Sequence, residues 1–538
     1  MATTVIFNDR EIIEPGVYAA VKGGGNSQPQ DFSFGNVCII DTGSGAGYGG
    51  GSGIDGEMAS DLGAVYGFDN LPEFRSFVRG GVLWDLADYL FNPGIGIRGV
   101  SKLWIVRAAT TTSASATFTL TNGVLAFKTK NEGACANGVL STKLRTGYGV
   151  ILKAGAVDSA KFMFEFFQGT YKGTDAGGED IGGIAQADCE PALVCRSAEV
   201  STIQELLNWV ATSRSFNALF TVTQTVGVGA ITSGDLAANA SLKLFAGATT
   251  TYNSTNVDLV LDAIKELDNT FFLADNWEDD SQNTYNVKIL SHIVNEAEFD
   301  KFMMIGGGRD DSKFKGSTYA SVETCQFYNS ANVMVKHSGI KVRNRNNTGF
   351  KILPSIYNAA LELGKICGLQ PQQSATFKGT RANMFCHLLK DRERKTALQN
   401  GLMHDRFVPG IGFVLNQAVN TLQSPKNVSL IQSNGQSYDV GIMRIAAQLN
   451  KELVLNMRPL FVGGNLNTAS PADVKAFIEG YLTKKTATKT DDNLIISFKK
   501  ITVKQVQDYY VVEYSFVPNG PINKIFVTGF MLDSNLTA

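Results

Sequence analysis

The sequence has little of what enzymes and metal proteins use for their chemistry. Only four histidines occur in 538 residues, and none stands in an H-E-x-x-H motif or in a Cys/His spacing typical of a metal site. Neither the phosphate-binding pattern G-x-x-x-x-G-K-[ST] nor the nucleophile pattern G-x-S-x-G is present. We therefore predict no catalytic residue, no metal ligand and no cofactor, and a protein that is not an enzyme.

Excess charge and long apolar runs are also missing. Lysine and arginine number 48 against 50 acidic residues, and no dense basic block occurs, so nucleic acid is not an expected partner. No run of about 18 apolar residues exists, and no basic segment precedes an apolar one near the N-terminus. We expect a soluble protein made in the cytoplasm, without membrane insertion.

Cysteine is sparse and scattered. No C-x-x-C pair occurs, so free buried thiols are expected, with disulfides between subunits as the alternative. The seven positions are Cys38, Cys135, Cys189, Cys195, Cys325, Cys367 and Cys386. What the chain does have is 44% hydrophobic and 18% charged residues over a length too great for one core. This indicates a globular protein of two to four domains.

The stretch from Asp508 to Leu532 contains two β-prone runs separated by the break Pro518 to Pro521. In the first run one side of the strand is apolar, through Tyr510, Val512, Tyr514 and Phe516. The second run lies almost at the chain end and includes Ile525, Phe526, Val527 and Phe530. An apolar strand in this position is expected to pair either with its own sheet or with a neighbouring chain.

The beginning of the chain mirrors its end. Val5, Ile6 and Phe7 form a short β-prone run, and Val17 and Tyr18 begin another after a Pro-Gly turn. The glycine- and glutamine-rich stretch 22–30 then has the composition of a flexible linker. We predict that both ends of the protein are strand arms.

The remaining segments predict an α/β protein with an insertion. Buried strands are expected at 36–41, 103–106, 271–273 and 302–305, with helices at 70–91, 257–267 and 289–297 between them. Short alternating runs between 109 and 234 indicate a mostly β insertion on the outside. A long helix is predicted at 440–455, ended by Pro459, and an amphipathic one at 472–482.

One glycine pattern keeps a nucleotide-binding enzyme open as an alternative. The strand 36–41 is followed by Gly45-x-Gly47-x-x-Gly50, which satisfies the dinucleotide fingerprint. That fingerprint requires a helix that starts within the glycines, whereas the residues after Gly50 stay glycine-rich and polar. The pattern is therefore a weak indication of a cofactor site.

The order of several segments resembles that of a tail sheath protein of a contractile-tailed, myovirus-type bacteriophage. These segments are Pro15 to Tyr18, the glycine-rich stretch, Pro72 to Phe74 with Gly80-Gly81, Leu103 to Arg107, 352–377, 444–453, 450–467 and the terminal strand pair. The resemblance covers roughly 1–110 and 240–538, and 111–240 has no counterpart. It implies an α/β (α+β) multidomain fold. The expected divisions are an arm and linker (1–30), a core (31–110 and 241–517), an inserted outer β domain (111–240) and a second arm (518–538).

The resemblance also implies what the terminal strands do. In sheath proteins the arms add strands to the sheets of neighbouring subunits. Here residues 4–7 with Val17 and Tyr18 would form one donated arm, residues 522–532 would form the other, and residues 509–517 would be the acceptor strand. Lys475 and Glu479 are candidate contacts to the inner tube, with an ordinary solvated helix face as the equally open alternative.

The implied function is mechanical. Hexameric rings would stack around an inner tail tube in a kinetically trapped extended state, and contraction would drive the tube through the host envelope without ATP. The implied partners are neighbouring sheath subunits, the inner tail tube protein, and baseplate and tail terminator proteins. The protein would be located in the virion after assembly in the host cytoplasm. Another self-assembling virion protein, a tube or capsid component, remains the main alternative and should lack the α/β core that flanks an insertion.

Overall fold

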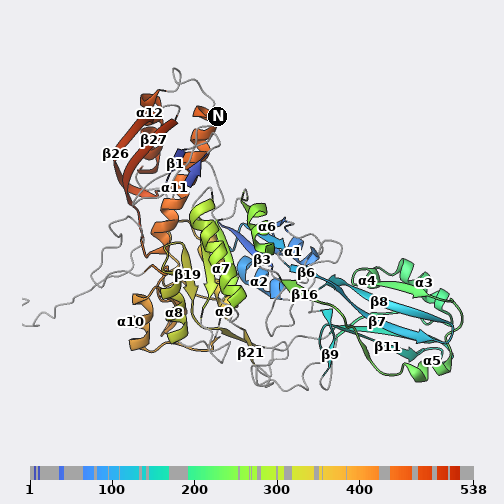
Figure 1. Ribbon diagram of the computed structural model, residues 1–538. Coiled ribbons are helices and arrows are strands. Elements are labelled where there is room, and N and C mark those ends of the chain that lie inside the picture. The colour runs from blue at the N-terminus through green and yellow to red at the C-terminus, as the bar shows by residue number, and fades with distance from the viewer. Residues whose placement is uncertain are drawn as a thin grey trace, which may run out of the picture.

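A computed structural model of the chain describes most of the residues between the two ends. The described residues are 5–7, 10–12, 35–41, 63, 65–77, 82–94, 96–107, 109–132, 136–140, 144–168, 192–252, 255–265, 267, 270–275, 280–297, 301–307, 318–343, 350–353, 355–382, 384–422, 437–462, 470–486, 493–506 and 509–520. Figure 1 shows an α/β core, an inserted domain on its right and a unit of helices and strands at the upper left.

The core is organised around a sheet of seven strands. Neighbouring strands are parallel except for the antiparallel pair at the β4 edge. In spatial order they are β23 (Leu402–Met403), β19 (Val333–Lys336), β18 (Phe302–Gly306), β17 (Phe271–Asp275), β3 (Asn36–Asp41), β5 (Lys102–Arg107) and β4 (Val65–Phe68). Parallel strands are covered on both faces and are apolar throughout, as the sequence FMMIG of β18 is. The predicted α/β class is confirmed.

Helices cover both faces of this sheet, and successive strand residues fill the two layers alternately. Val37 and Ile39 lie in one apolar core, while Cys38 and Ile40 lie in the other. The first core is closed by α1 (Leu71–Phe77), α2 (Val82–Phe91) and α9 (Ser355–Gly368). The second is closed by α6 (Thr255–Ile264), α7 (Asp280–Ser291) with its π-helical continuation η3 (His292–Glu296), and α8 (Thr318–Tyr328).

Smaller elements surround the β23 end of the sheet. A three-stranded sheet has the order β21 (Phe350–Leu353), β20 (Ile340–Arg343) and β22 (Met384–Phe385). Helix α10 (Asp391–Gln399) follows, and then an antiparallel hairpin of β24 (Asp405–Val408) and β25 (Gly412–Leu415).

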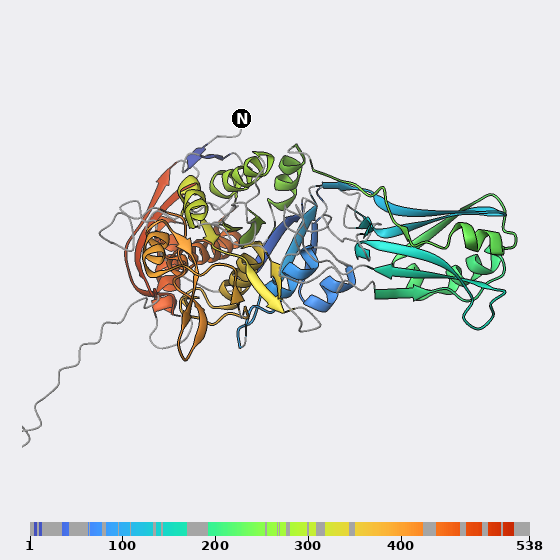
Figure 2. The ribbon, with the colours of Figure 1, turned by 90° about the horizontal axis from the view of Figure 1, so that it is seen from below.

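The inserted domain is connected to the core through an antiparallel pair, β6 (Ala109–Thr111) with β16 (Thr250–Tyr252), and projects away from it (Figure 2). One of its sheets has the order β14 (Phe220–Thr225), β8 (Gly123–Glu132), β7 (Ser113–Leu120). The other has the order β13 (Ala192–Arg196), β12 (Phe162–Gln168), β11 (Tyr148–Ala154), β15 (Lys243–Leu244). Its shorter elements are β9 (Val139–Leu140), β10 (Leu144–Thr146), α3 (Ile203–Thr212), α4 (Arg214–Asn217) and α5 (Ser233–Ala238).

The inserted domain has an apolar core of its own, in which aromatic rings predominate. The Phe127 ring contacts those of Phe118, Phe164, Phe166 and Phe216 at centroid distances of 5.1 to 6.1 Å, mostly edge to face. This core extends to Ala248, a few residues beyond 240, where the sequence predicted the domain to end. The domain therefore has a core separate from those of the main sheet.

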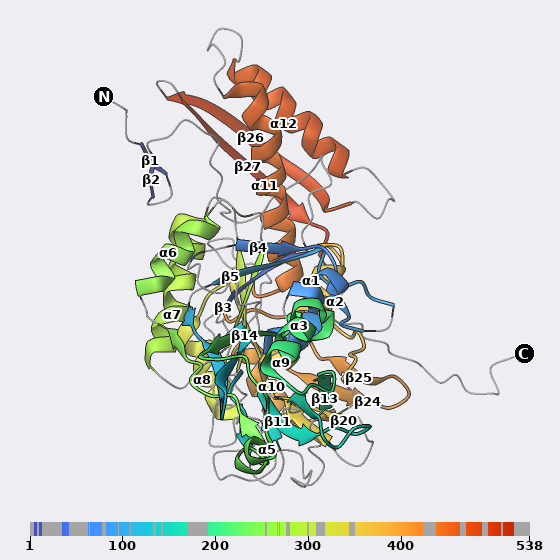
Figure 3. The same ribbon diagram turned by 90° about the vertical axis from the view of Figure 1, so that its right-hand side faces the viewer.

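The last unit consists of α11 (Val440–Phe461), α12 (Pro471–Thr486) and the antiparallel ribbon of β26 (Ile495–Val506) and β27 (Tyr509–Pro518), shown at the top of Figure 3. The prediction that Pro459 ends the first helix is wrong, because α11 continues to Phe461 with Pro459 in its last turn. A proline in a helix removes one hydrogen bond and crowds the preceding turn. Met457 and Phe461 pack into an apolar cluster with α12, which compensates for this cost.

Near the N-terminus the chain forms a short hairpin. The backbone of β1 (Val5–Phe7) pairs antiparallel with β2 (Arg10–Ile12). No disulfide joins the five described cysteines within the chain, and Cys38, Cys195, Cys325 and Cys367 are buried, as the sequence predicted. Among the described helices, none combines the length and apolarity needed to cross a membrane.

Candidate functional site: the C-terminal strand pair and a buried ion cluster

The ribbon of β26 and β27 packs one face on α11 and α12. Tyr510, Val512 and Tyr514 contact the apolar cluster of the two helices, and Phe516 lies against the first half of α11. The Tyr514 hydroxyl also donates a hydrogen bond of 2.7 Å to Asn450 Oδ1 on α11. The alternation in the sequence predicted this common face, which holds the ribbon firmly on its helices.

The two strands of the ribbon differ at their edges. The register between the two strands is irregular at two places, between Ile495 and Ser497 and between Lys499 and Thr502, and at both of them β26 carries one extra residue. Lys500, at the second place, has a φ of +53°. Strand β26 also presents Lys499, Lys500 and Lys504, whereas Glu513 is the charged residue of β27. Bulges and lysines discourage pairing at an edge, so β27 is the strand better suited to accept another. Within the described residues the sheet consists of these two strands.

The chain after β27 is attached to the same unit. The backbone N–H of Asn519 donates to Leu494 O at 2.9 Å, and its side-chain amide donates to Asn493 O at 2.8 Å. The position at which the chain continues toward the predicted C-terminal arm is therefore fixed next to the start of β26.

Helix α12 has an apolar inner face and a polar outer face. Val474, Ile478 and Leu482 are buried, whereas Lys475 and Glu479 are about half exposed and form an ion pair of 3.7 Å one turn apart. Ser470 and Asp473 cap the helix reciprocally through their side chains. The two candidate tube contacts thus lie on the solvent side of a helix that is packed through its other face.

A buried carboxylate lies between α11 and α12. Glu452 is fully buried and accepts hydrogen bonds from Gln448 Nε2 at 2.6 Å and from the Tyr481 hydroxyl at 3.3 Å. Burial raises the pKa of Glu452 to about 7. The two hydrogen-bond donors and the charges of Lys485 and Lys451 lower it, but they offset only part of the effect of burial. Burial also lowers the pKa of Lys451 to about 8. Both groups thus titrate closer to neutral pH than they ordinarily would.

We expect Glu452→Gln to stabilise the protein at pH 8 by about 3 kcal/mol and to have little effect at pH 4. The pKa of Glu452 in the folded state, about 7, lies above its ordinary value of 4.5, so the folded state binds the proton more tightly than the unfolded state does. The stability contributed by protonation is complete below pH 4.5 and is lost as the pH rises through 7. Denaturant unfolding of wild type and variant across this range measures the difference.

The exposed Glu479→Gln on α12 serves as the control, with an expected change within about 0.5 kcal/mol at every pH. A difference between Glu452→Gln and wild type that is the same at pH 4 and pH 8 would contradict the assignment.

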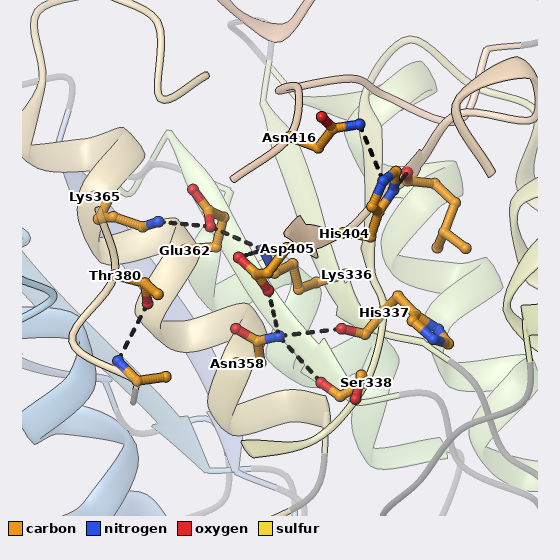
Figure 4. A network of polar contacts seen from close by, with 12 residues as sticks. Lys336, His337, Ser338, Asn358, Glu362, Lys365, Thr380, His404, Asp405 and Asn416 are labelled. Atoms are coloured by element: carbon orange, nitrogen blue, oxygen red, sulfur yellow. Dashed lines mark hydrogen bonds and ion pairs between the residues drawn. The ribbon is translucent and has the colours of Figure 1, made fainter. Parts of the chain in front are cut away.

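The second polar site is an ion cluster at the carboxyl end of β19 (Figure 4). Lys336 Nζ lies 2.9 Å from both Glu362 Oε2 and Asp405 Oδ1, and Lys365 Nζ lies 2.9 Å from the same Glu362 oxygen. All four side chains are buried, and their two positive and two negative charges balance. Burial opposes ionisation of Glu362, but Lys336 and Lys365 outweigh it and hold the pKa of its carboxyl below the ordinary value.

The cluster connects three elements of the core. Asn358 on α9 donates through Nδ2 to His337 O, Ser338 O and Asp405 Oδ2, each at 3.1 Å. Strand β19, helix α9 and the β24–β25 hairpin are thereby held together. The carboxyl ends of parallel strands are where α/β proteins ordinarily bind ligands. Here that position is filled by mutually compensating side chains, which is a structural arrangement and not a binding cleft.

Three of the four histidines gather beside this cluster. His337 Nε2 lies 3.2 Å from His387 Nδ1, and the Ser321 hydroxyl lies 2.8 Å from His337 Nδ1. Burial lowers the pKa of His337 to about 3 and that of His404 to about 4, so both are neutral at pH 7. Ser321 is fully buried, which leaves no access for a substrate to this Ser–His contact. The part of the chain that is described holds no group of three or more metal-ligating side chains.

The structure brings together some predicted residues and leaves others undescribed. Tyr510, Val512, Tyr514 and Phe516 share one face of β27, and Lys475 and Glu479 pair on α12. Val5, Ile6 and Phe7 form β1, of which only the backbone is described. Val17, Tyr18, Ile525, Phe526, Val527, Phe530 and the glycine pattern Gly45 to Gly50 lie outside the described residues.

Sequence reasoning missed the ion cluster. Lys336 lies 26 positions before Glu362 and 69 before Asp405, and only Glu362 and Lys365 are neighbours, three positions apart on α9, so no motif connects the four. The available signal was the presence of charged residues inside apolar segments, Lys336 after the run VMV and Glu362 and Lys365 within AALELGKIC. A charge at such a position requires a buried partner.

Comparison with solved structures identifies the fold. The chain superposes on the crystal structure of a sheath tail protein from Desulfitobacterium hafniense with a TM-score of 0.54 and 14% sequence identity, covering 93% of this chain and 100% of that one. The chain has the fold of a sheath tail protein. The match reaches into 111–240, for which the sequence offers no resemblance.

Two other sheath structures are similar at lower scores. A sheath tail protein from Listeria innocua gives a TM-score of 0.48 at 14% identity over 93% of each chain. The helical sheath of the anti-feeding prophage in its contracted state gives 0.37 at 14% identity, over 53% of this chain and 78% of that one. No family model and no curated protein sequence matches the chain.

Proposed function

We propose that the protein is the sheath subunit of a contractile phage tail. Hexameric rings of it stack around the inner tail tube, and their contraction drives the tube through the host envelope. The observation that carries this proposal is the sheath fold, which spans 93% of the chain and the whole of the matched sheath tail protein. The subunit acts mechanically and not as an enzyme, within the virion after assembly in the host cytoplasm. Its partners are its own copies, the tube protein, the baseplate and the tail terminator.

In this proposal β27 accepts a strand from another copy. Its outer side borders no further strand among the described residues, and its inner face is fixed to α11 and α12 through Tyr514 and Phe516. Main-chain hydrogen bonds at such an edge give affinity without demanding a particular orientation of the two subunits. The predicted arms at 4–18 and 522–532 supply the strands. The exposed pair Lys475 and Glu479 on α12 faces the inner tube.

We expect a chain that lacks residues 519–538 to fold but not to polymerise, because the strand that it would donate is gone. Negative-stain microscopy and sedimentation of the purified protein measure assembly, and circular dichroism measures folding. A matched control that lacks only 534–538, past the predicted strand, should form tubes as the full chain does.

The possible outcomes distinguish the sheath proposal from its alternatives. Tubes of normal length from the chain that lacks 519–538 would overturn the arm assignment. Closed shells from the full chain would favour a capsid component. A small particle that binds nucleotide would favour the enzyme alternative that uses Gly45 to Gly50.

A further inference from the structure

The outer side of the helix layer α6–α7–α8 is more apolar than a solvent-facing layer requires. Leu259, Val287, Val294 and Phe327 are between 41 and 64% exposed there. These side chains are not needed to pack the helices on the sheet, because other residues of the same helices, such as Val260 and Ile289, already fill that core. An outward helix face is ordinarily polar, so large exposed apolar side chains on each of α6, α7, η3 and α8 favour an interaction surface over a purely solvated layer.

The β24–β25 hairpin carries a second apolar surface. Phe407 is 57% exposed and Ile411, at the turn, is 68% exposed. The Phe407 ring packs on its cross-strand partner Phe413 with a centroid distance of 5.2 Å, so it is held in place without being covered. On the other face of the hairpin, the Arg406 guanidinium lies 4.3 Å from the ring centroid of the exposed Phe377.

The hairpin is also rigidly attached to the core. Asp405, its first residue, is part of the buried ion cluster through Lys336, and Leu415, its last, accepts a backbone hydrogen bond of 2.8 Å from Phe377. A surface that is fixed before binding loses little conformational entropy when it binds, which favours its use as a contact.

The two surfaces lie on opposite sides of the molecule. In Figure 3 helices α6, α7 and α8 are on the left and β24 and β25 on the right, and Figure 2, seen from below, separates them in the same way. A protruding surface and a receiving surface on opposite sides of one subunit form a heterologous, head-to-tail contact. Repetition of such a contact generates a ring or a helical array.

Charge supports pairing between these surfaces. The segments 376–382 and 405–415 carry Lys378 and Arg406, and their one acidic residue, Asp405, is buried, whereas Arg381 there is already paired with Asp88 at 2.8 Å. The outer sides of the helices carry Asp258, Asp262 and Glu323 together with Lys265 and Lys288, which leaves one more acidic than basic residue, and Lys288 is paired with Asp258 at 2.9 Å. Complementary charge around an apolar centre fixes the register of two docked surfaces.

We propose that the β24–β25 hairpin of one copy of this chain docks on the α6–α7–α8 face of the next copy. This contact is additional to the strand exchange at β27, and it rests on the proposal that the chain polymerises with itself. The occupant is a second copy because the apolar and charged features that the hairpin needs are present on the far side of the same molecule, where they repeat with every subunit.

The decisive experiment is a cross-link within polymers of the full chain. In Ile411→p-benzoylphenylalanine the photoreactive side chain stands at the hairpin turn, and mass spectrometry of the irradiated polymer locates its target. We expect intermolecular cross-links to peptides within 255–328. Cross-links that map to the inserted domain or to the chain ends, or that occur only within one chain, would overturn the proposal.

A second measurement uses substitutions at the same surface. The double variant Phe407→Ser with Ile411→Ser should require at least a tenfold higher protein concentration for assembly, because exposed apolar anchors at the centre of an interface carry most of its affinity. The control is Val157→Ser, at a valine of the inserted domain that is 95% exposed. Circular dichroism should be unchanged in both variants.

The two measurements separate this inference from the proposed function. If the wild-type chain fails to polymerise, the proposed sheath function fails. If the wild type polymerises and the double variant assembles at the same concentration as Val157→Ser, the sheath function stands and the hairpin contact is refuted.

Discussion

Replacing Lys336 by alanine is expected to lower the free energy of unfolding by about 3–5 kcal/mol. The substitution removes the ammonium group that lies 2.9 Å from both Glu362 and Asp405, and it leaves two fully buried carboxylates opposite the single charge of Lys365. An uncompensated buried charge is costly because the protein interior solvates it poorly. Denaturant unfolding of the monomer, followed by fluorescence, measures the change.

Two further variants test whether charge imbalance is the cause. Lys395→Ala removes an exposed lysine of α10 and should change stability by less than about 0.5 kcal/mol. The double variant Lys336→Met with Asp405→Asn removes one charge of each sign and should recover part of the lost stability. Equal stability of Lys336→Ala and Lys395→Ala would show that the cluster does not hold the core together.

The variant Phe127→Ala is expected to destabilise the inserted domain by about 3–5 kcal/mol while the α/β core stays folded. Phe127 is fully buried and contacts four other phenylalanine rings, so its removal leaves a cavity at the centre of the domain. Because this apolar core is separate from those of the main sheet, the loss should be local.

Hydrogen exchange read by mass spectrometry measures where protection is lost. We expect faster exchange in peptides from 113–248 and unchanged exchange in β17, β18 and β19. The control is Val157→Ala, because Val157 is almost fully exposed and its substitution should alter neither region. Loss of protection throughout the chain in Phe127→Ala would mean that the inserted domain and the core unfold as one unit.

The buried strands of the core could be predicted from the local sequence pattern, because a strand that is covered on both faces is apolar at every position. The run FMMI of β18 is apolar at every position, and the structure buries all four side chains. The face of β27 followed in the same way from the alternation of Tyr510, Val512, Tyr514 and Phe516. Each of these predictions depends on neighbours one or two positions apart.

Predictions that depended on more distant residues failed or were never made. Pro459 was expected to end its helix, but packing of Met457 and Phe461 against α12 carries α11 past it. The partner of β27 among the described residues is the twelve-residue strand β26. The gathering of Lys336, Glu362, Lys365 and Asp405 left no motif at all.

The sequence by itself determined the α/β class, the buried strands and the absence of motifs for catalysis, because these depend on composition and on the spacing of close neighbours. Only the tertiary structure decided which charges compensate one another inside the core and which strand of the ribbon keeps a regular edge. It alone also placed the apolar hairpin and the apolar helix face on opposite sides. Such properties arise from contacts between residues far apart in the chain, and side chains that far apart are brought together by the fold and not by their order.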